Sequence, residues 1–535
     1  MTGRRTLAVA ALLLVAAVVF VLPVGRRPLY NQDEVRYAIL ARDVAENGHW
    51  FLPRVRDQIY LNKPPLFFWA VALVSLPAGR VSDVTAPLVS VISALAGLLG
   101  VFAIGRRLWG FRAGFAAAAV LAATPFYFFM AHQVLTDMML TAWLVWALYF
   151  YLRVCAPAAG RLPWLGFYLC VAGGLSTKGP VALLALAAAV VASAVTDGRA
   201  GLRALRLPAG IGLIALTTLP WLLPYALQSE KSYAETVLVT DYLGWYFREN
   251  ADSRALALFT YLAGFLPWAL VLPLAVRWWW ADPDRDRRRL LAWSGVFVVA
   301  LAVSAAQRSR YFLPMLPLLA LLVGDLVVRA PAVAGARGHR LVTAVAGVFA
   351  AVAVASVAAL FLAPAGLSAT GGDWVYLPPP GLERDLMAGF VLAGAGAGLL
   401  AAWRRADGFT VATCWALALI AVLGLEGIGY PGRYAEWYGV RSFAEQLRKA
   451  RPSGTALLAY PDANLAFDFY LRGSIREMRL PEQVIAVVRR PAAHTALLIR
   501  EERWTALQPG ADPSWRPVAS AVVGGRPFVL LGNFE

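Results

Sequence analysis

Two adjacent acids, Asp33 and Glu34, follow the first apolar segment of the chain and are the first residues that could carry chemistry. A charged side chain at the edge of a membrane is costly, so its presence there favours a functional role. A carboxylate in this place can accept a proton from an attacking hydroxyl group or orient an acceptor. The alternative is structural, because Asn31 or Asp33 could cap a helix that runs from Glu34 to Glu46.

The use of lysine marks two further positions. The chain contains 45 arginines but only four lysines, two of which are Lys63 in the segment NKPP and Lys178 in the segment TKGP. A compact ammonium group beside rigid Pro or Gly suits a phosphate group, which it binds as a point charge. The alternative is that each side chain only reaches from the apolar layer to the water, as interfacial lysines do.

More polar side chains recur where apolar segments begin. Asp137 opens one such segment, Arg248 and Arg254 precede another, and Arg310 and Tyr311 open a third. Loops on the outer face of a bacterial membrane are usually poor in Arg and Lys. An anionic ligand on that face would explain these cations. Phosphate is the natural candidate, because Arg and Lys stabilise the charge that develops on a departing phosphate oxygen.

These residues must be positioned by membrane helices. Hydrophobic residues make up 60% of the 535 residues and charged residues 15%, and the mean hydropathy is +0.61. Soluble domains are about one quarter charged, so lipid is the expected solvent. The apolar segments predict about thirteen spans, at roughly 6–24, 84–104, 114–131, 138–154, 163–176, 180–196, 207–227, 256–276, 290–306, 311–328, 341–363, 387–403 and 409–427.

The distribution of arginine supports this topology. Seven alternate gaps between the predicted spans are rich in Arg, beginning with Arg4 and Arg5 and ending with Arg404 and Arg405. The positive-inside rule assigns these gaps to the cytoplasm. The acids and cations described above then lie at the periplasmic edge of a multi-pass protein of the bacterial inner membrane.

Two domains are predicted. Residues 1–428 form an all-α membrane domain, whose first periplasmic loop, 25–83, contains an apolar stretch too short to span, at 66–77. Residues 429–535 alternate short β-like and helical runs, which is typical of a small periplasmic α/β domain.

Several functional classes are disfavoured. The net charge of +17 is spread over short loops, where Arg sets topology, so it does not indicate nucleic acid. Neither GxGxxG after a strand nor GxxxxGK[ST] occurs, so no nucleotide site is expected. All three cysteines lie in or beside apolar segments, which leaves none for the polar C-terminal region. Residues 6–24 lack a clear cleavage site and are expected to remain as the first helix.

Five motifs in order resemble those of the aminoarabinose lipid A transferases, which belong with the protein mannosyltransferases to the GT-C fold. The motifs are DEVRY at 33–37 with KPP at 63–65, TD at 136–137, TKG at 177–179, NADSR at 250–254 before GFLPW at 264–268, and RYFLP at 310–314. The resemblance covers nearly the whole chain and implies thirteen spans with a C-terminal periplasmic α/β domain.

The resemblance also implies roles for single residues. Asp33 would be the essential carboxylate and Asp137 a second acid. Glu34, in the same motif, is a further candidate catalytic acid, and it would shape the site together with Arg36 and Tyr37. The carrier-lipid phosphate would be bound by Lys63, Arg254 and Tyr311, with help from Arg310. Lys178 matches a family position without a distinct role, and Arg248 lies in the loop that holds Arg254.

One position departs from the family. Aminoarabinose transferases carry an acid just before the Lys of the first loop, where this chain has Asn62. A divalent metal bound through that acid is therefore not supported, and His49 and His132 do not form a recognisable ligand pair. No metal ligand is assigned.

The resulting hypothesis is an inverting glycosyltransferase, expected to be monomeric, that moves a sugar from a polyprenyl-phosphate donor to a periplasmic acceptor. Asp33 would be the general base for a hydroxyl acceptor and would position an acceptor that is already anionic. Lipid A, another envelope glycan or lipid, and protein Ser or Thr all remain open as acceptors, as does the identity of the sugar. A membrane transporter or flippase is the alternative class, disfavoured because the charges gather at one face.

Overall fold

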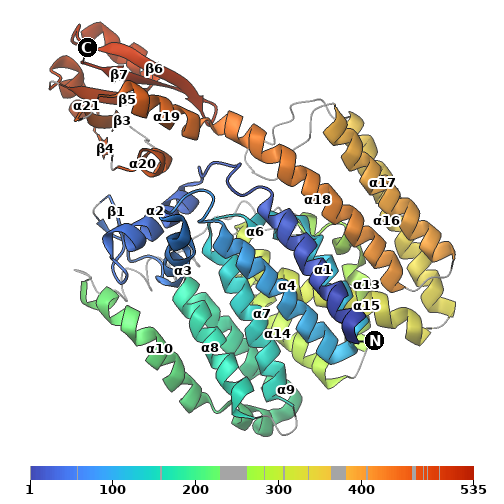
Figure 1. The fold of residues 1–535 in the computed structure, drawn as a ribbon. Coiled ribbons are helices and arrows are strands. Elements are labelled where there is room, and N and C mark those ends of the chain that lie inside the picture. Colours follow the sequence, from blue (N-terminus) through green and yellow to red (C-terminus); the bar gives the residue numbers. More distant parts are fainter. Residues whose placement is uncertain are drawn as a thin grey trace.

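The structure is a computed structural model in which a helical bundle carries a small α/β domain at one end (Figure 1). It describes residues 2–56, 58–156, 160–228, 262–281, 284–304, 308–334, 336–362, 381–404, 408–452, 454–460, 465–473, 475–478, 480–492 and 494–534.

The bundle consists of helices that follow the predicted spans closely. Their bounds are α1 Thr2–Val21, α4 Leu88–Trp109, α5 Phe111–Ala122, α6 Pro125–Ala131, α7 Thr136–Val154, α8 Arg161–Lys178, η2 Pro180–Ala182, α9 Leu183–Leu205, α10 Leu207–Gln228, η5 Trp268–Val271, α13 Leu272–Ala281, α14 Arg285–Val303, η6 Ser309–Met315, α15 Leu316–Ala334, α16 Ala336–Leu362, α17 Leu382–Trp403 and α18 Gly408–Tyr438.

Eight helices in the described ranges are long and apolar enough to cross a membrane, or nine if the bent pair α5–α6 is one span. The count of thirteen stays a prediction. The predicted span at 256–276 begins outside the described residues, and its described part is a turn and two short helical segments rather than one helix. Pro267 and Pro273 lack the N–H groups that a continuous helix would use there.

Small residues let the helices of the bundle approach closely. A Cβ atom on Gly105 of α4 would lie 2.7 Å from the Cα of Gly114 on α5. A Cβ on Gly324 of α15 would lie 2.7 Å from Ala117, about one turn further along α5. Since lipid supplies no hydrophobic force between helices, such close packing is the main attraction that holds α4, α5 and α15 together.

The first predicted loop folds into two helices and a hairpin at the end of the bundle nearest the C-terminal domain (Figure 1). Its elements are α2 Gln32–Asn47, β1 Arg54–Val55, β2 Gln58–Ile59, α3 Leu66–Ser75 and η1 Leu76–Ala78. The apolar stretch predicted to be too short to span is α3 with η1. Its residues Phe67, Phe68 and Val71 are fully buried, so this helix forms part of the core beneath α2.

The C-terminal domain has a five-stranded sheet in the order β4-β3-β5-β7-β6. Strand β3 is parallel to β4 and β5, whereas β7 is antiparallel to β5 and β6. The elements are α19 Val440–Ala450, β3 Ala456–Tyr460, α20 Leu465–Leu471, β4 Arg476–Glu477, α21 Pro481–Arg489, β5 Thr495–Arg500, α22 Glu501–Leu507, η7 Gln508–Gly510, β6 Arg516–Val523 and β7 Arg526–Gly532.

Helix α18 joins this domain to the bundle (Figure 1). Its apolar part ends at Gly429, close to the predicted boundary at 428, but the helix continues to Tyr438. The domain is also held against α2, because the Arg42 guanidinium donates to the carbonyl of Phe469 at 3.0 Å. The Tyr470 hydroxyl accepts from the backbone N–H of Leu29 at 2.7 Å. The C-terminal domain and the first loop therefore form one packed unit.

A buried charge cluster joins three helices at the end of the bundle away from the C-terminal domain. Asp325 on α15 is fully buried and accepts from Arg287 of α14 at 2.6 Å. It also accepts from the indole N–H groups of Trp278 and Trp279 of α13, at 3.0 and 2.9 Å. Buried charges are stable only when they are paired in this way. The cluster therefore fixes α15, which is the direct continuation of η6.

Replacement of Asp325 by Ala is expected to destabilise the protein by about 3–5 kcal/mol, because it removes the carboxylate that the buried Arg287 guanidinium binds. Thermal unfolding in lipid nanodiscs should therefore begin at a clearly lower temperature. The matched control is Glu502→Ala, which removes an exposed acid that lies 3.5 Å from Arg500 and should change stability by less than about 0.5 kcal/mol. Equal unfolding temperatures for the two variants would show that the cluster does not stabilise the bundle.

Candidate active site

A cavity of about 350 Å³ lies where the first loop meets the bundle. Eight of the eleven residues singled out from the sequence line it: Asp33, Arg36, Tyr37, Lys63, Asp137, Lys178, Arg310 and Tyr311. They come from α2, the loop before α3, the first turn of α7, the last turn of α8, and η6. Five segments that are distant in sequence thus bring their polar side chains to one place.

Much of the remaining lining of this cavity is apolar. It is formed by side chains of α7, α9 and α14, including Leu140, Leu144, Leu184, Phe297 and Leu301. The lining of the cavity therefore combines charged side chains with a hydrophobic surface. That combination suits a ligand with an anionic head and a hydrocarbon chain.

Asp33 lies at the centre of the charged side chains. The Asn31 side chain caps α2, because its oxygen accepts from the backbone N–H of Asp33 at 3.0 Å. The Asp33 carboxylate is therefore not the N-cap of this helix. One of its oxygens accepts from Arg36 at 2.9 Å, and the other accepts from Arg310 at 2.8 Å. Arg308 lies 3.6 Å from the second oxygen.

These arginines set the protonation state of Asp33. Burial alone would raise the pKa of Asp33, but the neighbouring guanidinium groups, Arg310 first among them, hold it below its ordinary value. The carboxylate is therefore ionised at neutral pH and is a weak base. Its geometry suits the positioning of cations better than the removal of a proton.

Asp137, Lys178 and Tyr311 form a second group in the cavity. The Lys178 ammonium donates to Asp137 at 2.5 Å and lies 4.9 Å from the centre of the Tyr311 ring. Asp137 begins α7 and Lys178 ends α8, so the antiparallel packing of these two helices brings the pair together. The ion pair is nearly buried, with side chains 4% and 14% exposed.

Lys63 stands at the rim of the cavity. Its ammonium group donates to the backbone carbonyl of Asn62 at 3.1 Å and remains exposed. The two prolines that follow, Pro64 and Pro65, restrict the backbone directly before α3. The ammonium group of Lys63 is therefore well placed to bind an anion that enters the cavity.

Glu34 is directed elsewhere, and the catalytic role predicted for it is not supported by this geometry. Its carboxylate is fully buried and accepts from Arg27 at 2.6 and 2.9 Å. It also accepts from the backbone N–H of Val134 at 2.9 Å. The next residue along a helix points about 100° away, so Asp33 and Glu34 cannot both face the same cavity. Glu34 ties α2 to the α6–α7 connection.

Two predicted residues, Arg248 and Arg254, lie outside the residues that the structure describes. The lining also includes polar residues that were not predicted as site residues: Tyr60, Asn62, Thr136, Ser304 and Arg308. Arg308 opens the same segment as Arg310 and belongs to the same group of cations at the membrane edge, although it was not predicted as a site residue. Within the described ranges, no three His, Cys, Asp or Glu side chains are close enough together to hold a metal ion.

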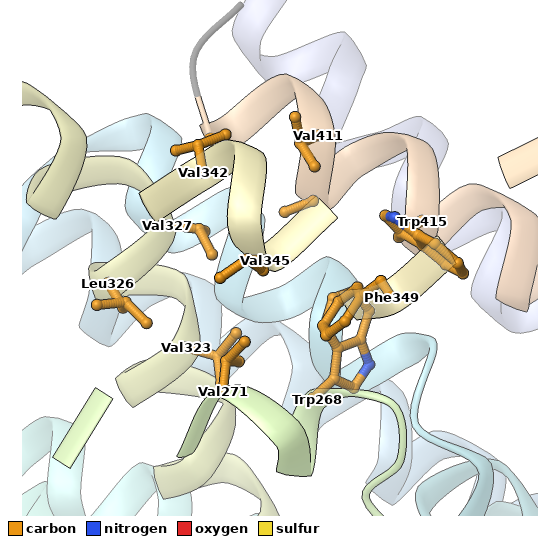
Figure 2. A pocket seen from close by; sticks show the side chains of 12 residues that line it. Trp268, Val271, Val323, Leu326, Val327, Val342, Val345, Phe349, Val411 and Trp415 are labelled. Carbon is orange, nitrogen blue, oxygen red and sulfur yellow. The ribbon is translucent and has the colours of Figure 1, made fainter. Parts of the chain in front are cut away.

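An apolar cavity elsewhere in the bundle is a packing void rather than a site. It is enclosed by α15, α16, α18 and η5, and Figure 2 shows Phe349, Trp268 and Trp415 beside it. The room inside is only about 30 Å³, which is enough for one or two water molecules but not for a lipid chain.

The sequence and the fold have counterparts among known proteins. Residues 62–223 match the family described as dolichyl-phosphate-mannose-protein mannosyltransferase. The undecaprenyl phosphate-alpha-4-amino-4-deoxy-L-arabinose arabinosyl transferase of Erwinia tasmaniensis is 29% identical over 425 residues, which are 76% of this chain and 73% of that protein. The crystal structure of ArnT from Cupriavidus metallidurans bound to undecaprenyl phosphate covers 100% of this chain and 98% of its own, with a TM-score of 0.79 and 20% identity.

The chain is a GT-C glycosyltransferase that resembles the aminoarabinose transferases. A more distant GT-C structure, the oligosaccharyltransferase AglB from Archaeoglobus fulgidus, covers 94% of this chain and 71% of its own, with a TM-score of 0.53 and 12% identity. The predicted resemblance, fold class and enzyme class are thus confirmed, as is a multi-pass protein of the bacterial inner membrane. The roles of the single residues in this GT-C site remain predictions.

The Lys178–Asp137 pair is expected to act as a unit in this GT-C enzyme. Lys178→Met and Asp137→Asn should each lower kcat/KM, and the double variant should lose less than the sum of the two. We expect a coupling energy of about 1–3 kcal/mol from a double-mutant cycle on kcat/KM. Strictly additive losses would mean that the two side chains work independently.

Proposed function

We propose that the protein transfers a sugar from a polyprenyl-phosphate donor to an anionic acceptor at the periplasmic face of the inner membrane. The observation that carries this proposal is the shape of the active-site cavity, which joins a cluster of cations to an apolar wall. The head of a polyprenyl phosphate needs cations, and its chain needs an apolar surface. The relatives named above support the same donor class.

The reaction is a displacement at the anomeric carbon of the sugar. The bond from that carbon to the phosphate oxygen breaks, and the polyprenyl phosphate leaves with the electron pair. Lys63 and Tyr311, assisted by Arg310, stabilise the negative charge on the departing phosphate. The acceptor oxygen attacks from the opposite side and forms the new bond, so the configuration inverts. Arg254 would belong to this group by resemblance.

The nature of the acceptor follows from the state of the two acids. Asp33 is bonded to Arg36 and Arg310, and Asp137 is bonded to Lys178. Neither is arranged as a good general base, which a hydroxyl acceptor would require. A phosphate or carboxylate acceptor is already ionised and needs no proton removed. Among the acceptors left open by the sequence, a phosphorylated glycan or glycolipid such as lipid A is favoured.

The pH dependence of transfer tests this role of Asp33. Because the pKa of Asp33 is lowered, its carboxylate is ionised at every pH above the ordinary range of aspartate. The ratio of kcat/KM between the parent and Asp33→Asn is therefore expected to stay constant from about pH 5.5 to about pH 8.5. A ratio that instead rises about tenfold per pH unit as the pH increases through part of this range would identify Asp33 as a base with a raised pKa.

The orientation of the site follows from charge. The end of the bundle that bears Arg285, Arg287 and Arg289 of α14 is basic and would face the cytoplasm by the positive-inside rule. Helix α2, which carries Asp33 and Arg36 of the cavity lining, lies at the other end, near the C-terminal domain (Figure 1).

The direct test is incubation of the full chain in proteoliposomes with a donor labelled in its sugar. We expect free polyprenyl phosphate and labelled acceptor in equal amounts when a phosphorylated glycolipid is present, and neither when it is dephosphorylated. Transfer that requires a free hydroxyl group would overturn the acceptor assignment. Movement of intact donor across the membrane without cleavage would identify a flippase instead.

A further inference from the structure

A second and larger cavity adjoins the active-site cavity. Its volume is about 840 Å³, and it lies between the first loop and the C-terminal domain. The two cavities share three lining residues, Arg36, Tyr60 and Asn62. One of them, Arg36, bonds directly to Asp33. A ligand in the second cavity would therefore reach the wall of the active site.

The walls of this cavity are fixed by ion pairs between the two domains. Arg56, in the turn between β1 and β2, donates to Asp468 of α20 at 2.7 Å and to Glu477 of β4 at 2.8 Å. Its backbone is in the left-handed region, with φ of 50°, which directs the side chain to a place that a regular strand would not reach. The second cavity is thus preformed by the packing of the C-terminal domain on the hairpin.

The lining of the cavity is polar and positively charged. Four arginines line it and only one described acid, Glu477, whose carboxylate is engaged by Arg56. Arg500 ends β5 and lies 3.5 Å from Glu502, whose side chain is 69% exposed and is therefore screened by water. Arg526 begins β7 on the exposed side of the β6–β7 turn. Arg500 and Arg526 thus present positive charge to the cavity from the C-terminal domain.

We propose that this cavity binds a second anionic group of the acceptor, with Arg500 and Arg526 as its ligands. The planar guanidinium groups match phosphate or carboxylate oxygens, and the amides of Gln32, Gln58 and Asn62 suit the hydroxyl groups of a sugar between them.

This inference rests on the proposed function and deepens it. The preferred acceptor is then a glycan with two anionic groups, one of which reacts near Asp33 while the other is held by the C-terminal domain. The C-terminal domain therefore selects the acceptor, and the bundle binds the donor.

The test compares two acceptors with the full chain in proteoliposomes, lipid A with two phosphates and its monophosphoryl form. Arg526→Ala is expected to raise the KM for the bisphosphorylated acceptor about 10- to 100-fold, the effect of losing a charge-assisted hydrogen bond. It should leave the KM for the monophosphoryl acceptor and the affinity for donor unchanged. The matched control is Arg516→Ala, which removes an exposed arginine from the same β6–β7 pair, outside the lining.

Direct binding of the deacylated, bisphosphorylated glucosamine disaccharide is measured in parallel. Binding that is lost in Arg526→Ala supports the site and shows that the glycan head, rather than the acyl chains, is recognised. Equal KM values and equal binding for the parent and both variants would overturn the inference. If the parent binds the disaccharide through Arg526 but transfers no sugar, the proposed function fails while the binding site stands.

Discussion

Replacement of Asp33 by Asn is expected to reduce kcat/KM for sugar transfer by about 10²- to 10³-fold, the usual effect of removing one preorganised electrostatic contact. The carboxylate holds Arg36 with one oxygen and Arg310 with the other. The Asn side chain has only one acceptor oxygen, and its NH2 group cannot accept a hydrogen bond, so it cannot bind both guanidinium groups. Arg36 and Arg310 would then no longer be held in place by one shared carboxylate, although the cavity keeps its shape.

The control for this variant is Asp385→Asn, which changes an exposed acid in the first turn of α17. Both proteins should insert and unfold like the parent, and only Asp33→Asn should lose transfer, measured with labelled donor. Full activity of a correctly inserted Asp33→Asn protein would remove this residue from the mechanism.

Replacement of Lys63 by Ala is expected to have an effect of similar size, about 10²- to 10³-fold in kcat/KM, because it removes a positive charge at the rim of the donor cavity. Lys63→Arg should restore only part of the activity, since a guanidinium fork does not reproduce a compact ammonium group beside Pro64. Single-turnover measurements with labelled donor would separate loss of binding from loss of bond cleavage.

Lys449→Ala is the matched control, because Lys449 is exposed on α19 of the C-terminal domain. It should bind and cleave the donor as the parent does. If Lys63→Ala behaves in the same way as Lys449→Ala, the ammonium group at position 63 does not contact the phosphate.

The membrane bundle was predictable because its signal is repeated. Apolar length and the alternation of Arg-rich gaps agree with each other over the whole chain, so most helices lie where they were expected. The C-terminal strands were found for a similar reason, since β3 to β7 lie in the region 429–535 where β-like and helical runs were predicted to alternate. The prediction was weakest where proline interrupts the apolar pattern, as at η5 and α13, because hydropathy does not report a broken backbone.

The site was predictable only in part. The cost of placing a charge at a membrane edge singles out Asp33, Asp137 and Lys178, and the structure brings them to one cavity. The same argument singled out Glu34, whose role depends on a partner, Arg27, that apolar patterning cannot pair with it. Likewise, the contact of the Arg56 turn with the C-terminal domain joins residues more than 400 positions apart. Such contacts carry no local signal.

The central claim is that cations at one end of the bundle hold a lipid-linked phosphate. The most direct measurement is the pair of dissociation constants of the full chain in nanodiscs for undecaprenyl phosphate and for undecaprenol, which lacks the phosphate. We predict that the phosphate form binds about 10²-fold more tightly, and that Lys63→Ala removes most of this difference. Equal affinities for the two lipids would contradict the account.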